Sequence, residues 1–172
     1  FDSDDETLCA ENGWLNLQEV KLICHDPSQR FSMSCVADYM PDRPAPLWRK
    51  TVDQVFGGNA DLVTYFQRAV GYSLLGGNSE QVLFICHGAG ANGKSLLLEA
   101  IKDVLGSYAQ SLPISTLMRA KINASGASPE IARLRGIRFA LASETEKGQR
   151  WSANKIKTLT GSDTLATRAL YQ

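Results

Sequence analysis

The spacing of apolar residues changes along the chain, and the first stretch has the two-residue period of a strand. Trp14 to Leu17 alternates apolar and polar positions directly after the turn dipeptide Asn12-Gly13, which predicts a short strand. The stretch 31–39 predicts a second one. We therefore expect a small β-containing segment at the start of the chain.

Helical spacing follows after three prolines between positions 41 and 46, which mark a linker or a helix entry. Residues 47–56 have the spacing of a helix that ends at Gly57-Gly58, and residues 60–75 predict a second helix. The apolar face predicted for the second helix consists of Leu62, Phe66, Ala69, Val70 and Leu74. This pattern indicates a small helical module.

An unbroken apolar run then spans residues 82–86, as in a parallel strand that is covered on both faces. A glycine-rich turn comes next, and an amphipathic helix ending at Gly106 follows it. The predicted buried face of this helix consists of Leu97, Ala100, Ile101, Val104 and Leu105. The order strand, glycine-rich loop and helix is that of a phosphate-binding unit.

The loop between this strand and helix reads GAGANGKS and matches the pattern G-x-x-x-x-G-K-[ST] in full. Glycines let backbone N–H groups approach phosphates, and the helix N-terminus adds partial positive charge. Lys94 would reach the terminal phosphates of ATP, and the Ser95 hydroxyl would bind Mg²⁺. The predicted nucleotide-binding residues are Gly88, Ala89, Gly90, Ala91, Asn92, Gly93, Lys94, Ser95 and Leu96.

A second chemical element follows a short strand at 112–117 and a short helix at 130–135. The apolar stretch 137–142 predicts a strand that ends in the acidic residues Glu144 and Glu146. Carboxylates at the end of such a strand can approach Mg²⁺ or polarise the attacking water. We expect Glu144 to be the main acid and a metal ligand with Ser95, and Glu146 to be the weaker second acid. A solvated turn after the strand is the alternative.

The last element is a short helix that Ser152 caps, followed by a turn and the arm of a hairpin. Basic residues lie around it at Arg150, Lys155, Lys157 and Arg168. The net charge of the chain is zero, so contact with nucleic acid would need such a local cluster. From composition alone, a solvated basic helix face is the commoner explanation of these residues.

Composition fits a soluble globular protein, because 44% of the 172 residues are hydrophobic and 21% are charged. An apolar run near 18 residues and a signal-peptide pattern are both missing, so we expect no membrane association and a cytoplasmic location. The four cysteines have irregular gaps and indicate free thiols rather than a zinc site. Because the chain starts at Phe1 without Met, we expect a piece of a longer protein.

The spaced motifs together resemble the phage and plasmid primase–helicases, whose C-terminal half is a superfamily 3 helicase related to the poxvirus-type nucleoside triphosphatase–primase. The motifs that carry the resemblance are ENGWLNL at 11–17, GYSL at 71–74, HGAGANGKS at 87–95, LRGIR at 134–138, SETE at 143–146, and KTLTGSDT at 157–164 through Arg168. They cover nearly the whole chain and are more specific than the phosphate loop alone.

This resemblance implies an α/β fold with a P-loop ATPase core of the AAA+ type at 79–172, preceded at 1–78 by the lead-in and helical module. It implies a helicase motor that hydrolyses ATP with Mg²⁺ and assembles as a homo-hexamer around single-stranded DNA during phage or plasmid replication in a bacterial cell. Residues 88–95 would be the Walker A motif and Glu144 with Glu146 the Walker B acids. Lys155, Lys157 and Arg168 would lie in the element that carries a DNA-contacting hairpin.

One departure concerns the sensor strand and arginine finger, which the resemblance places beyond Gln172. The sensor strand would lie between the two core strands, so we expect this chain alone to bind ATP weakly and to hydrolyse it poorly. Two alternatives remain open at this point. One is a small-molecule P-loop kinase, and the other is a non-catalytic fragment for DNA binding or oligomerisation.

Overall fold

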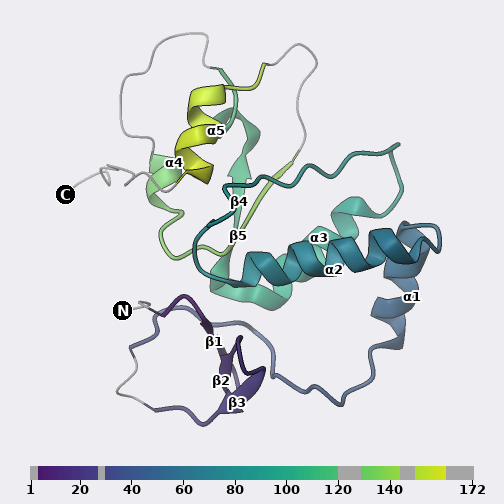
Figure 1. Ribbon diagram of the computed structural model, residues 1–172, viewed down its shortest axis with the longest axis vertical. Helices are drawn as coiled ribbons and strands as arrows, with labels where there is room; N and C mark the ends of the chain where they lie inside the picture. Colours follow the sequence, from purple (N-terminus) through teal and green to yellow (C-terminus); the bar gives the residue numbers. More distant parts are fainter. Residues whose placement is uncertain (1–3, 27–29, 120–128, 144–149, 162–172) are drawn as a thin grey trace.

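The computed structural model describes residues 4–26, 30–119, 129–143 and 150–161. Figure 1 shows a small N-terminal sheet at the bottom, helices α2 and α3 side by side across the middle, and β4, β5, α4 and α5 above them. The strands are β1 (Thr7–Ala10), β2 (Gly13–Asn16), β3 (Lys21–Ile23), β4 (Ala109–Pro113) and β5 (Phe139–Ser143). The helices are α1 (Pro46–Val55), α2 (Ala60–Leu74), α3 (Lys94–Leu105), α4 (Pro129–Ala132) and α5 (Ala153–Thr160), with 3-10 turns at Gly106–Tyr108 and Ile114–Thr116.

The N-terminal sheet confirms the predicted lead-in. Strands β1, β2 and β3 form an antiparallel meander in which Trp14 pairs with Cys9 on one side and Ile23 on the other. The predicted strand at 31–39 is wrong, because this segment is irregular. Its backbone groups bond to two different elements: Cys35 N–H donates to Cys9 O at 2.8 Å, and Val36 N–H donates to Val104 O at 3.1 Å. The segment therefore joins β1 to the end of α3 instead of extending one sheet.

The two helices predicted before the loop are confirmed as α1 and α2. Helix α1 starts with Pro46 in its first turn, and helix α2 is capped by Asn59, whose side chain accepts from Asp61 N–H and Leu62 N–H. The face of α2 differs at one position, since Leu62 is exposed while Phe66, Ala69, Val70 and Leu74 are half-buried. The rings of Phe56 and Phe66 lie 5.2 Å apart and close the α1–α2 hairpin.

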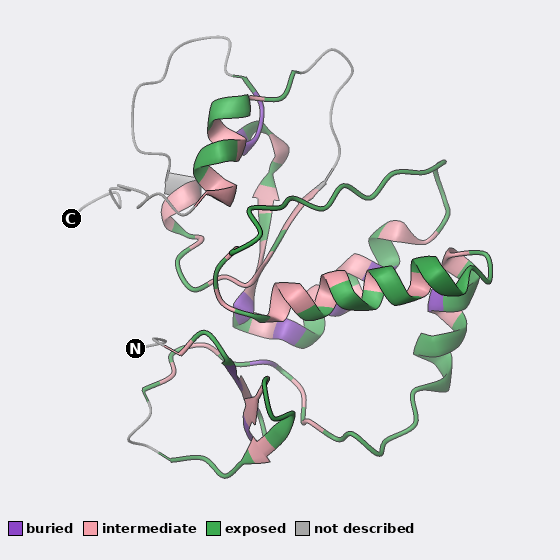
Figure 2. Cartoon of the chain, viewed as in Figure 1, coloured by how far each residue is buried: buried purple, intermediate pink, exposed green. Residues whose placement is uncertain are grey.

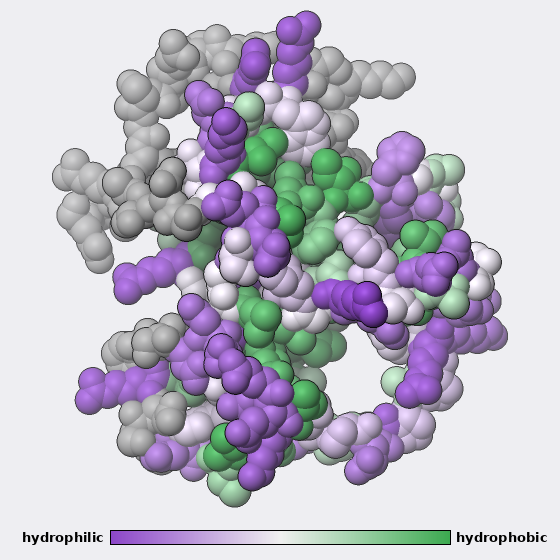
Figure 3. Space-filling model, viewed as in Figure 1, coloured by the Kyte–Doolittle hydropathy of each residue, from purple (hydrophilic) through white to green (hydrophobic). Residues whose placement is uncertain are grey.

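The predicted strand at 82–86 is wrong, because these residues form an extended segment without strand pairing. Val82, Leu83, Phe84 and Ile85 are 39%, 42%, 39% and 69% exposed. Apolar atoms accordingly gather at the centre of the face in Figure 3, where this segment passes above α2. Within the described residues no neighbouring strand supplies the ladder that such a run needs, and the Phe84 ring instead packs edge-on against Tyr72.

The predicted helix after the loop is confirmed as α3. Leu97, Ile101 and Leu105 are buried on one face, whereas Val104, which was expected there, is 51% exposed. Gly106 ends the helix with φ of 55°, a left-handed conformation that favours glycine.

The second sheet is a parallel pair of β4 and β5, with Ala109 opposite Phe139 and Pro113 opposite Ser143. The strand predicted at 137–142 is confirmed as β5. The strand predicted at 112–117 lies earlier, as β4, and a 3-10 turn follows it at Ile114–Thr116. The parallel pair with its helices makes the fold mixed α/β.

A hydrophobic core joins elements from β1 to β5. It consists of Leu8 on β1, Cys35 on the joining segment, Ile101 and Leu105 on α3, and Tyr108 before β4. Phe66, Val70 and Leu74 of α2 and Phe139 of β5 pack against it. Figure 2 shows buried residues on β1 and on α3 in the same region of the molecule. The N-terminal sheet and the loop helix are therefore stabilised by one shared set of apolar contacts. In the described residues, none of the helices has the length and apolar character needed to span a membrane.

Candidate nucleotide-binding site

The glycine-rich loop lies against the end of α1 at the point where it enters α3. Gly93 precedes the helix with φ of 84°, a conformation that side chains rarely adopt. A Cβ at this position would also lie only 2.6 Å from Cγ2 of Val55, the last residue of α1. Glycine is therefore needed at position 93 for both its backbone conformation and its close contact with α1.

The side chain of Lys94 is folded back into the loop. Its ammonium group donates to Gly88 O at 3.2 Å, to Ala89 O at 3.0 Å and to Asn92 Oδ1 at 2.7 Å. An ammonium has three donors, so these three oxygens satisfy it completely. The loop therefore places a positive charge among inward-facing oxygens at the N-terminal end of a twelve-residue helix.

The rest of the loop is open to solvent. Residues 88–92 and the side chains of Ser95 and Leu96 are exposed. Ala91 has φ of 56°, so the chain reverses sharply in the middle of the loop. Exposed backbone N–H groups at a helix N-terminus can bind an anion such as a phosphate. The structure thus brings Gly88, Ala89, Asn92 and Lys94 of the predicted set into direct contact.

The predicted acids Glu144 and Glu146 lie outside the described residues. The strand that leads to them ends at Ser143, whose backbone pairs with Pro113 of β4. In the described ranges, which leave out 120–128 and 144–149, no cluster of three or more His, Cys, Asp or Glu residues could hold a metal. Cys24, Cys35 and Cys86 form no disulfide. The roles of Ser95 and Glu144 as Mg²⁺ ligands therefore stay predictions.

Helix α5 carries two of the predicted basic residues, and Ser152 caps it as expected by accepting from Lys155 N–H at 3.4 Å. Lys155 is half-buried and donates through Nζ to Ser115 O at 3.2 Å, so one of its three ammonium donors is occupied within the chain. Lys157 is exposed on the same helix. Arg168 lies outside the described residues.

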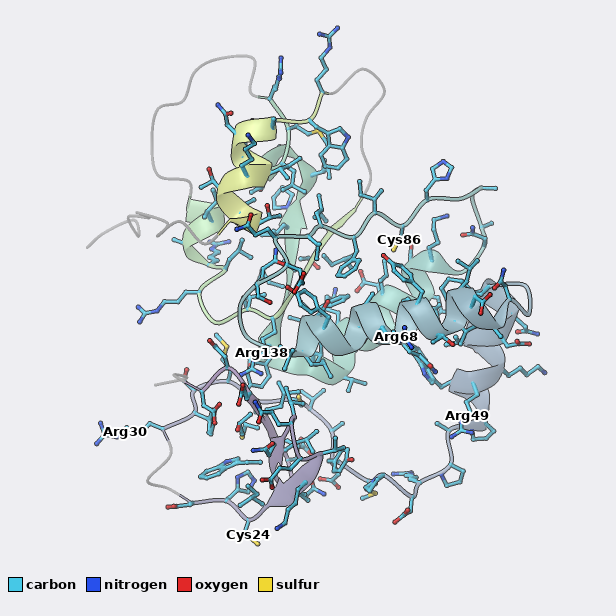
Figure 4. The ribbon with its side chains drawn as sticks, in the orientation of Figure 1. Cys24, Arg30, Arg49, Arg68, Cys86 and Arg138 are labelled. Carbon is cyan, nitrogen blue, oxygen red and sulfur yellow. The ribbon has the colours of Figure 1, made fainter. Side chains whose placement is uncertain are left out.

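Sequence reasoning missed the structural importance of Arg138. Its guanidinium donates to four backbone carbonyls, those of Asp4, Asp5, Thr7 and Leu74, at 2.7 to 3.2 Å. It also lies over the Tyr108 ring, 5.0 Å from the centroid. Figure 4 shows it between the N-terminal sheet and the rest of the molecule. The sequence shows Arg138 as the last residue of the LRGIR motif and as an arginine at the beginning of an apolar strand, and neither reveals its acceptors.

Comparison with known proteins extends this picture. The family model described as "D5 N terminal like" matches residues 1–57, which include the N-terminal sheet and α1. A protein of Acanthamoeba polyphaga mimivirus named "Putative helicase" is 38% identical over 99 residues, which are 58% of this chain and 10% of the mimivirus protein. A "Putative helicase" of Frog virus 3 is 33% identical over 108 residues, 62% of this chain and 11% of the relative.

A "Putative primase" of African swine fever virus aligns along the whole chain, with 24% identity over 181 aligned positions and 18% of its own length covered. The matches support a relationship to the primase–helicase family. The chain spans only about a tenth to a fifth of the length of these relatives. They are proteins of eukaryotic viruses, so the phage or plasmid replicon and bacterial host expected from the sequence have no counterpart among them.

Proposed function

We propose that this chain is part of the ATP-driven helicase motor of a replication primase–helicase of the superfamily 3 type. Its loop at 88–95 binds the phosphates of ATP, Ser95 and Glu144 bind Mg²⁺, and Glu146 assists the attacking water. The observation that carries the proposal is the position of Lys94, whose charge lies inside a glycine-rich loop at a helix N-terminus. The similarity to viral relatives named as helicases and primases supports the replication setting.

Single-stranded DNA and a homo-hexameric ring are part of the same proposal. ATP hydrolysis would drive translocation along the strand, with Lys157 and Arg168 contacting its phosphates. Such contacts are independent of sequence and weaken as the salt concentration rises. The exposed position of Lys157 on α5 supports its role, whereas Lys155 is held by Ser115 and contributes less.

The direct test is Lys94→Ala, measured by equilibrium binding of a fluorescent ATP analogue with Mg²⁺. We expect about a 10- to 100-fold loss of affinity, because a charge-assisted contact to phosphate disappears. Lys50→Ala changes an exposed lysine on α1 and serves as the control, with affinity unchanged. Equal affinity of the Lys94 variant and the wild type would contradict nucleotide binding at this loop.

Contact with DNA is tested by comparing Lys157→Ala with Lys155→Ala, using titration of a labelled single-stranded oligonucleotide at several salt concentrations. Removing one phosphate contact should reduce the slope of log affinity against log salt by about 0.7 for single strands. We expect this change for Lys157→Ala and a smaller one for Lys155→Ala. Unchanged slopes in both variants would remove α5 from the DNA-binding surface.

A further inference from the structure

Asn92 supplies the shortest of the three contacts that hold Lys94. Its side-chain oxygen lies 2.7 Å from Lys94 Nζ, compared with 3.2 Å for Gly88 O and 3.0 Å for Ala89 O. The two carbonyls belong to the backbone, which every residue type provides. The third acceptor depends on the side chain at position 92, so this contact is the one that the sequence specifies.

The same amide also reaches the beginning of the loop. A Cβ built on Gly88 would lie 2.7 Å from Asn92 Nδ2, so the amide nitrogen packs directly against the backbone of Gly88. One end of the Asn92 side chain thus contacts the first glycine of the loop, and its other end contacts the lysine that begins α3. The side chain spans the loop from its start to its end.

We infer that Asn92 is a positioning residue for Lys94, which its amide oxygen keeps inside the loop while no nucleotide is bound. The inference rests on the proposed function, since it concerns how the lysine is held ready for a phosphate. Phosphate oxygens entering the loop take over the donors that the loop oxygens satisfy in the free protein. Because the ammonium is already held close to its working position, little side-chain freedom remains to be lost when phosphate binds.

Two substitutions separate the acceptor from the size of the side chain. Asn92→Leu keeps a branched side chain of similar size but removes the oxygen that accepts from Lys94. Asn92→Asp keeps an oxygen at the same position and therefore keeps the contact. Lys50, an exposed lysine on α1, provides an internal reference in each protein.

The experiment is trace labelling of the full 172-residue chain with an amine-reactive reagent, followed by peptide mass spectrometry. An ammonium reacts with such a reagent only after it leaves its hydrogen-bond partners and loses a proton. We expect Lys94 in the wild type to react about three- to tenfold more slowly than Lys50, as for a net stabilisation by charge-assisted hydrogen bonds. Asn92→Leu should raise the ratio of the Lys94 rate to the Lys50 rate about threefold or more, and Asn92→Asp should leave it at or below the wild-type value, because a carboxylate accepts from an ammonium more strongly than an amide does.

Equal labelling rates for Lys94 and Lys50 in the wild type would overturn the inference. This comparison needs no variant, so it holds even where a variant fails to fold. An unchanged ratio in a folded Asn92→Leu protein would overturn it as well. Adding Mg²⁺ and ATP tests the proposed function separately, because bound nucleotide should slow the labelling of Lys94 further. Absence of that protection, with the Asn92→Leu effect intact, would contradict nucleotide binding while supporting the positioning of Lys94 by Asn92.

Discussion

At the scale of single residues, Arg138 bonds to two separate parts of the chain, although the sequence analysis did not mark it as a site residue. Its guanidinium joins the carbonyls of the N-terminal segment to that of Leu74 at the end of α2, and its central carbon lies over the Tyr108 ring. Guanidinium groups suit this role because they present several donors in a fixed plane. Arg138 immediately precedes β5, the strand that leads to the predicted acids. The hydrogen bonds of Arg138 therefore hold the beginning of this strand.

We expect Arg138→Met to lower the free energy of unfolding by about 2–4 kcal/mol, because partly buried carbonyls lose their charged donor. Urea denaturation followed by circular dichroism measures this. Arg135→Met is the matched control, since Arg135 is exposed in the same connection, and its effect should stay within about 0.5 kcal/mol. Similar losses in the two variants would mean that the four carbonyl contacts of Arg138 do not stabilise the fold.

The residues of the loop were predictable because the pattern fixes both the glycines and the lysine. The partner of Lys94 was not, since the pattern leaves position 92 free and only the folded loop shows the Asn92 contact. Arg138 was missed for a similar reason. Its acceptors are backbone carbonyls from residues 4–7 and 74, and no sequence pattern records which carbonyls a distant side chain will reach.

At the scale of elements, helices were predicted better than strands. The bounds of α1, α2 and α3 follow from local signals such as Pro46, the Asn59 cap and Gly106, which act within one turn of the chain. A strand instead depends on a neighbour that can lie far away in the sequence. The segments 31–39 and 82–86 both have strand-like composition, yet neither has a continuous ladder in the described part of the chain.

The segment before the loop offers a direct comparison between a predicted strand and the observed extended chain. Ile85 is 69% exposed, whereas Ile101 on α3 is 8% exposed in the shared core. We expect Ile101→Ala to lower the free energy of unfolding by about 2–5 kcal/mol and Ile85→Ala to change it by less than about 0.5 kcal/mol. Chemical denaturation of the two variants measures both changes in unfolding free energy. Equal losses would show that 82–86 is a buried strand, as the sequence predicts.

At the scale of the whole molecule, one core connects the N-terminal sheet to the loop helix and the parallel strands. The D5-like match ends at residue 57, but the contacts of that region do not, because Leu8 and Cys35 pack against Ile101 and Leu105. Elements that share a core tend to unfold together. Stability of the phosphate loop should therefore depend on the N-terminal sheet, even though this sheet is distant in sequence.

The shared core also makes stability sensitive to alkaline pH. Tyr108 is only 1% exposed, and its hydroxyl oxygen accepts from Cys9 N–H at 3.1 Å. Burial raises the pKa of Tyr108 above its usual 10.0, and burial likewise raises the pKa of the Cys35 thiol above its usual 9.0. The folded protein thus retains protons that the unfolded chain releases at high pH.

The contribution of these two groups to stability is complete below the pKa values that they have in the unfolded chain. It is lost as the pH rises past those values toward the higher pKa values of the folded protein, because only the unfolded chain then releases the protons. We expect the unfolding free energy to decline as pH rises above 9.0 and more steeply above 10.0. Tyr108→Phe should cost about 1 kcal/mol at neutral pH, through the lost hydrogen bond, but should show a shallower alkaline decline. Urea titrations at a series of pH values measure the loss at neutral pH and the steepness of the alkaline decline. Tyr65→Phe is the control, because Tyr65 is exposed. An equally steep decline in Tyr108→Phe and the wild type would mean that Tyr108 ionises as readily in the folded core as in the unfolded chain.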